Sequence, residues 1–193
     1  MFQTLKVLVR MTATQPRRAA GALLTHTPPF SLSLELAILV VALGAILTFL
    51  LTPFSSVPGM AFVYVLLSNP ILLAFVQMIT LLVTVVVVFA AGRIFGGKGD
   101  LNQSLAITVW LQFIMLLLQI VLVPVLVLSA PLAQALTALA NIFAVWVFVN
   151  FVAELHGFSS LLKVFAGMIA TAFATSFLII FLLAMIGMGA MGA

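Results

Sequence analysis

The sequence predicts an all-α, polytopic membrane protein with five transmembrane helices and a short amphipathic, interfacial helix at its N-terminus. Of its 193 residues, 66% are hydrophobic and only 5% are charged, whereas charged residues make up about a quarter of a typical soluble domain. The apolar residues fall into five long blocks, and each block is long enough for a helix that crosses the roughly 30 Å hydrocarbon core. These blocks lack the alternation of apolar and polar residues that marks a transmembrane barrel.

Residues 1–32 are predicted to be a cytoplasmic, amphipathic segment ahead of the transmembrane domain, residues 33–193. Its basic side chains are Lys6, Arg10, Arg17 and Arg18. The first two fall on a different side of a helix from the apolar positions Phe2, Leu5, Leu8 and Val9. We therefore expect a helix on the inner membrane surface that contacts anionic lipid, with a second short helix from about Pro16 to before His26. The alternative is a mobile basic tail, since termini are often poorly ordered.

The five spans are predicted at about residues 33–52, 70–95, 102–128, 132–156 and 160–187. Asn69 and Asp100 precede the second and third spans and are predicted N-caps, because their side chains accept hydrogen bonds from free backbone N–H groups. Gly157 is a predicted C-cap of the fourth span. Between the first two spans, residues 59–68 are too short to cross, and we expect them at the outer interface with Tyr64 as an anchor.

The basic residues predict the orientation of the chain. The N-terminal segment carries four of the seven, the loop between spans two and three carries Arg93 and Lys98, and Lys163 follows span four. All seven then lie on one side of the membrane, which is the cytoplasmic side under the positive-inside rule. The N-terminus is therefore predicted in the cytoplasm and the C-terminus outside. The pI is about 10.4. Because the basic residues that raise it lie at one membrane surface, their placement is explained by topology, and we expect no nucleic-acid partner.

The predicted membrane interior contains no charge, which disfavours a proton-coupled or ion-coupled pump. Neutral side chains instead predict a buried polar seam on spans two to four, which consists of Gln77, Thr80, Thr84, Gln112, Gln119 and Asn141. Interhelical hydrogen bonds are one interpretation of the seam; a polar groove for a lipid headgroup or a small neutral solute is the other. On span five, Gly167, Thr171 and Thr175 recur every four residues and predict close packing against a helix of this chain or of another.

Titratable side chains are predicted to gather at a cytoplasmic rim, which consists of Glu35, Arg93, Lys98, Glu154, His156 and Lys163. A carboxylate near an imidazole suits acid–base catalysis, or a metal site if Glu35 joins them. However, Glu154 and His156 point roughly 200° apart on a helix, so we favour a salt bridge from Glu154 to Arg93 or Lys163. The chain has no cysteine and no catalytic or nucleotide-binding motif, so we expect neither enzyme activity nor a metal or cofactor.

Two stretches resemble the bacterial branch of the YIP family of five-span membrane proteins. They are Phe95–Leu101 (FGGKGDL) and Ala153–Ser159 (AELHGFS), and Gln15–Ala20 is also similar to that branch. The resemblance implies a bacterial inner membrane, a cytoplasmic N-terminus and a periplasmic C-terminus. Eukaryotic members are associated with Rab-type GTPases and vesicle traffic. This chain lacks their long cytosolic domain and their Asp-Leu-Tyr-Gly-Pro pattern, so GTPase binding is not carried over.

Together these observations predict a non-enzymatic inner-membrane protein with an accessory, adaptor or membrane-organising role. It would act through contacts with another membrane protein, with a second copy of itself or with membrane lipid of the anionic inner leaflet. The alternative is a passive carrier or scramblase-like path for lipid or a small neutral solute, lined by Gln77, Thr80, Gln112 and Gln119. A third hypothesis is a membrane-embedded enzyme that uses Glu154 and His156.

Overall fold

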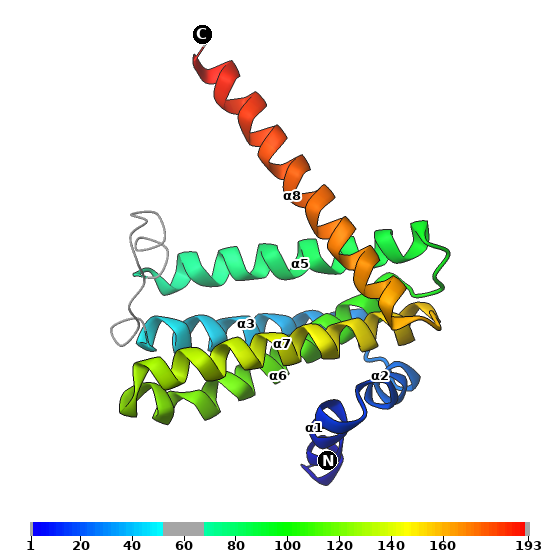
Figure 1. Ribbon diagram of the computed structural model, residues 1–193, viewed down its shortest axis with the longest axis vertical. Helices are drawn as coiled ribbons and strands as arrows, with labels where there is room; N and C mark the ends of the chain where they lie inside the picture. Colours follow the sequence, from blue (N-terminus) through cyan, green and yellow to red (C-terminus); the bar gives the residue numbers. More distant parts are fainter. Residues whose placement is uncertain (1, 52–67, 192–193) are drawn as a thin grey trace.

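The computed structural model describes residues 2–51 and 68–191, and the side chains of residues 3–51 and 68–177. All regular structure in these ranges is helical (Figure 1). The helices are α1 (Phe2–Thr14), α2 (Pro16–Thr25), α3 (Phe30–Leu51), α5 (Pro70–Ile94), α6 (Leu101–Leu128), α7 (Ala130–His156) and α8 (Leu161–Met191). Of the predicted interfacial segment, residues 59–68, all but Ser68 lie outside the described residues, and so does its anchor Tyr64.

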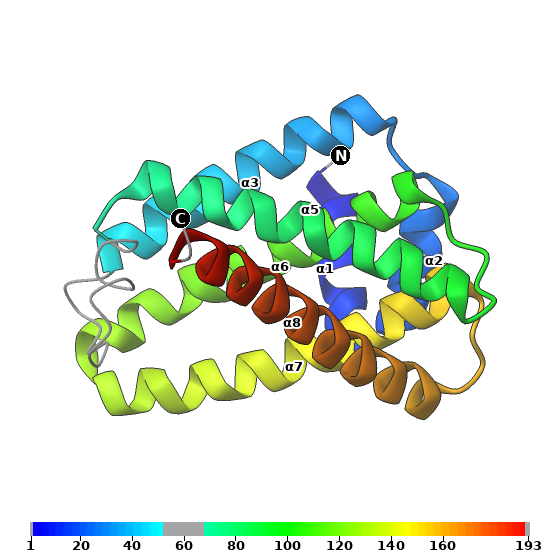
Figure 2. The ribbon, with the colours of Figure 1, turned by 90° about the horizontal axis from the view of Figure 1, so that it is seen from above.

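Helices α3, α5, α6 and α7 lie alongside one another and form the bundle (Figures 1 and 2). Each of these four is long and apolar enough to cross a membrane. Where α3, α5 and α6 meet, side chains such as Val41, Leu81 and Leu105 are at most 5% exposed. Many other large apolar side chains of the bundle remain exposed in the structure, as expected for helices whose outer surface faces lipid.

Helix α8 departs from this arrangement. It begins beside the ends of α5 and α7 and then diverges from the bundle (Figure 1). Val164, in its first turns, is buried in the same cluster as Val152 of α7. The helix is 31 residues long. Its side chains are described only from Leu161 to Phe177, an apolar stretch that is too short to count as a candidate span. The structure thus shows four candidate spans, and the fifth span stays a prediction.

The three predicted helix caps are confirmed. The Asn69 side chain accepts hydrogen bonds from the N–H groups of Ile71 and Leu72, both at 3.1 Å. Asp100 accepts from the N–H of Gln103 at 2.8 Å in a full capping box. Gly157 ends α7 with φ of 70°, a left-handed conformation that glycine adopts without a Cβ clash. Local sequence therefore determined where these helices begin and end.

The N-terminal segment folds back onto the bundle. It forms two helices, and the predicted start of the second at Pro16 is confirmed. Ala19 and Ala20 of α2 are fully buried in a cluster with Ala153 of α7, because their small side chains allow the two helices to approach closely. In α1, the Thr12 hydroxyl accepts a hydrogen bond from Trp110 Nε1 at 3.0 Å. These contacts argue against a mobile basic tail.

Candidate functional site

His156 is the most enclosed side chain of the rim. It ends α7, is only 2% exposed, and contacts both α5 and the loop that joins α5 to α6. Its Nδ1 accepts a hydrogen bond from the backbone N–H of Gly99 at 3.3 Å, and its Nε2 lies 3.1 Å from the carbonyl oxygen of Val88. Because Gly99 N–H can only donate, we assign the proton to Nε2, which then donates to Val88. A neutral imidazole satisfies both partners.

Three glycines make room for this imidazole. A Cβ added at Gly92 of α5 would overlap the ring, and one at Gly97 would lie 2.5 Å from His156 Nδ1. A Cβ at Gly99 would lie 2.6 Å from Cγ of Leu155 and 2.9 Å from the His156 ring. The backbone N–H of Lys98 also donates to the carbonyl oxygen of His156 at 3.3 Å. Residues 95–100 between α5 and α6, here called the glycine loop, therefore form one packed unit with the end of α7, which no local sequence pattern predicted.

Glu154 contacts the N-terminal segment. Its Oε2 accepts a hydrogen bond from Arg17 Nε at 2.9 Å, and Arg17 Nη2 donates to the carbonyl oxygen of Phe158 at 2.6 Å. The predicted partners Arg93 and Lys163 were therefore wrong. The physical reason is that α2 packs across α7 and brings a guanidinium, with its forked donors, to the carboxylate. Arg17, predicted at the lipid surface, thus also holds α2 against the end of α7.

The other cations of the N-terminal segment and the rim form no ion pair among the described side chains. Lys6 and Arg10 are exposed on α1, and Arg18 donates to Gln15 Oε1 at the surface. In the rim, Arg93 lies with its Cζ 5.9 Å from the ring centroid of Phe89. Glu35, Lys98 and Lys163 are exposed. Among the described side chains, none of the rim residues except Glu154 has an oppositely charged partner, and no cluster there offers three metal-binding groups.

Part of the predicted polar seam is assembled between α5, α6 and α7. Gln77, Thr80, Thr84 and Gln112 line a cavity of about 340 Å³. Thr80 and Thr84 satisfy their hydroxyl protons on their own helix, by donating to the carbonyl oxygens one turn earlier at 2.8 Å. The Oε1 atom of Gln77 is buried without a hydrogen-bond partner. The cavity is thus mostly apolar, and the side-chain amides of Gln77 and Gln112 are the polar groups in it that do not bond to their own helix.

Two predicted members of the seam lie outside this cavity; the predicted burial of Asn141 is wrong, whereas Gln119 forms an interhelical hydrogen bond of the predicted kind. Gln119 Nε2 donates to Thr48 Oγ1 of α3 at 3.1 Å, and Asn141 is exposed on α7. Gln119 follows Gln112 by nearly two helical turns and so shares its face. That face meets α5 and α7 near Gln112 but α3 near Gln119, because the neighbours of a helix change along its length when helices cross.

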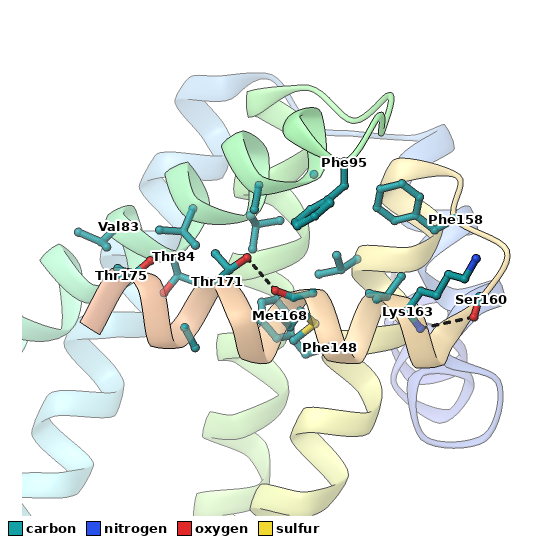
Figure 3. A pocket seen from close by; sticks show the side chains of 18 of the residues that line it. Val83, Thr84, Phe95, Phe148, Phe158, Ser160, Lys163, Met168, Thr171 and Thr175 are labelled. Atoms are coloured by element: carbon teal, nitrogen blue, oxygen red, sulfur yellow. Dashed lines mark hydrogen bonds between the residues drawn. The ribbon is translucent and has the colours of Figure 1, made fainter. Parts of the chain in front are cut away.

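A groove of about 560 Å³ lies between α5 and α8 (Figure 3). Gly167, Thr171 and Thr175, the small-residue face predicted to pack against a helix, line this groove. A Cβ at Gly167 would lie 3.8 Å from the Phe95 ring, so one extra carbon could be accommodated there. Ser160 and Lys163 lie at the end of the groove where α8 begins (Figure 3). The recurrence of small residues was the only sequence signal of the groove.

Comparison with known proteins yields one match. The family model described as Yip1 domain matches residues 11–188, which extend from the end of α1 into α8 and include both stretches that meet at His156. No curated protein and no solved structure matches the chain.

Proposed function

Because the chain belongs to the Yip1 domain family of membrane proteins, we propose that it is a non-enzymatic accessory protein of the bacterial inner membrane. It would act through contacts with another membrane protein, with a second copy of itself or with lipid. One observation carries the non-enzymatic part of the proposal: both candidate catalytic side chains are engaged in packing. Glu154 pairs with Arg17, and the His156 nitrogens bond to backbone groups of Gly99 and Val88. The His156 ring therefore has no nitrogen left for a substrate, and Glu154 is held by a guanidinium rather than beside the imidazole.

The dimensions of α6 support the proposed placement in the membrane. This helix is 28 residues long, about 42 Å at 1.5 Å per residue, whereas the hydrocarbon core is about 30 Å thick. Trp110, which binds α1 through Thr12, lies about 14 Å along α6 from its first residue. The part of α6 near α1 is therefore proposed to lie in the headgroup layer. Tryptophan is enriched at that depth.

The positive charges of the rim support the proposal that the protein makes its contacts on the cytoplasmic side. Arg93, Lys98 and Lys163 have no acidic partner among the described side chains, and Lys98 is held beside His156 by its backbone. Fixed, unpaired cations at one membrane surface attract anionic lipid headgroups and acidic protein surfaces. We propose that α8 is the fifth span, which places the N-terminus in the cytoplasm and the C-terminus in the periplasm.

Affinity purification of the tagged full-length chain in mild detergent tests this proposal. We expect a defined membrane protein, or a second copy of the chain, to copurify. Exchange of Lys98 for Gln should weaken this association, because the removed cation lies on the proposed contact side. The Gln112→Leu variant should keep it, because Gln112 lies inside the bundle. Absence of any stoichiometric partner, self-association or retained lipid would refute the proposal.

A passive carrier is the second candidate function, and the cavity lined by Gln77, Thr80 and Gln112 is the observation that favours it. A carrier should produce flux of lipid or neutral solute in proteoliposomes, and Gln77→Leu or Gln112→Leu should abolish that flux. Gln119→Leu is a matched control, because Gln119 bonds to α3 outside the cavity. Equal flux in all three variants would exclude this cavity as the path.

A further inference from the structure

We propose that the groove between α5 and α8 binds one anionic phospholipid, with its phosphate beside Lys163 and Ser160 and its acyl chains along α8. This inference rests on the proposed function in one respect, since it specifies lipid as one of the contacts. The occupant follows from three properties of the groove, which are its lining, the charge at one end and its length.

The lining is apolar along most of the groove. Side chains such as Val87 of α5, Phe148 of α7 and Met168 of α8 face it, and Thr84, Thr171 and Thr175 are interspersed (Figure 3). The Thr84 and Thr171 hydroxyl protons are donated to backbone carbonyls of their own helices, at 2.8 and 2.7 Å. These two threonine side chains therefore present their methyl groups and the lone pairs of their oxygens to the groove. At these two positions a hydrocarbon chain meets no free donor, and along the groove it removes apolar surface from water or loose lipid contact.

The charge is confined to one end. Lys163, the third residue of α8, has no acidic partner among the described side chains, and no residue that lines the groove carries a carboxylate. Ser160 accepts a long hydrogen bond of 3.4 Å from the Lys163 N–H, so its own hydroxyl proton is available to a ligand. Lys163 and Ser160 lie together beyond the apolar stretch (Figure 3). An ammonium and a hydroxyl side by side complement a phosphate.

The length of the groove matches one leaflet. From Lys163 to Ser176, the last lining residue along α8, the helix advances about 20 Å. One leaflet contributes about half of the 30 Å hydrocarbon core, and the headgroup layer adds several ångströms. The groove therefore holds an amphiphile whose headgroup is at the rim and whose chains end near mid-bilayer. Because α8 diverges from the bundle (Figure 1), a lipid can enter sideways from the membrane.

Native mass spectrometry of the full-length chain tests the headgroup site. The protein is taken from nanodiscs of equal parts phosphatidylglycerol and phosphatidylcholine, and we expect one retained phosphatidylglycerol. Lys163→Gln should lower the preference for phosphatidylglycerol about fivefold, the effect expected for one cation near anionic lipid. Lys98→Gln removes an equal charge from the rim but outside the groove, so it should lower the preference clearly less than Lys163→Gln does. Equal effects of the two variants would show non-specific attraction and overturn the proposal.

A pair of tryptophan variants tests the acyl site. Thr171→Trp fills the groove, whereas Phe173→Trp places the same side chain on a part of α8 that is 74% exposed and outside the groove. Thr171→Trp alone should release lipid of both kinds, while circular dichroism shows unchanged helix content in both variants. Retention of lipid by Thr171→Trp, or a protein dimer without lipid in the wild type, would overturn the inference. If a protein that binds no lipid still copurified with a partner, the lipid proposal would fail while the proposed accessory function would stand.

Discussion

Exchange of Gly92 for Ala is the sharpest test of the packed unit around His156. Gly92 lies within α5 in ordinary helical conformation, since only Gly96 and Gly157 have positive φ among the described residues. A methyl group there would overlap the imidazole of His156. The ring must move, because the added methyl group is attached to the backbone of α5 and cannot move itself. Its displacement breaks the hydrogen bonds to Gly99 and Val88.

The expected cost follows from these contacts. Overpacking of a close-packed site costs about 1–3 kcal/mol, and a buried donor such as the Gly99 N–H, left without a partner, costs about 1–3 kcal/mol more. Alanine is favoured over glycine within a helix by up to about 1 kcal/mol, which offsets part of this. We therefore expect Gly92→Ala to lower the free energy of unfolding by about 3 kcal/mol.

Unfolding by sodium dodecyl sulfate in mixed micelles, followed by circular dichroism, measures this free energy. Gly44→Ala of α3 is the matched control, because a Cβ there meets only Gln77 Oε1 at an ordinary 3.6 Å. It should be neutral or slightly stabilising. The double variant Gly92→Ala/His156→Ala should be more stable than the sum of its single variants by about 2 kcal/mol, since removal of the ring makes room for the methyl.

Two results would refute this reasoning. If Gly92→Ala unfolds like Gly44→Ala, the imidazole does not occupy the space above Gly92. If the double variant shows only additive effects, the two positions are not in contact, and the packing of the glycine loop against α7 is wrong.

Two further predictions concern the N-terminal segment and the orientation. Arg17→Ala should destabilise the protein by about 1 kcal/mol and speed hydrogen exchange in α2, because Glu154 loses its partner; Arg18→Ala should do neither, and equal exchange in the two variants would contradict the docking of α2. Since the chain has no cysteine, single cysteines at Lys98 and Ser129 can be labelled in cells with a membrane-impermeant maleimide. Only Ser129→Cys should react from outside, and labelling of both from one side would disprove the proposed topology.

Local features of the sequence were sufficient for the helices and their ends. Transfer of long apolar stretches into hydrocarbon and the need to satisfy free backbone groups act within one segment. Asn69, Asp100 and Gly157 could therefore be identified as caps without knowledge of the fold. Helical geometry was also enough to show that Glu154 and His156 diverge.

Which helix each side chain meets was decided only by the tertiary structure. Helices that are apolar on all sides carry little signal for the face that turns inward, so Asn141 was wrongly predicted to be buried and the helix that Gln119 meets could not be predicted. Arg17 reaches Glu154 only because α2 folds back across α7, and the three glycines surround His156 only because the α5–α6 loop packs against the end of α7. The groove beside Lys163 exists because α8 leaves the bundle. Such contacts depend on crossing angles between segments distant in sequence, and no local pattern encodes those angles.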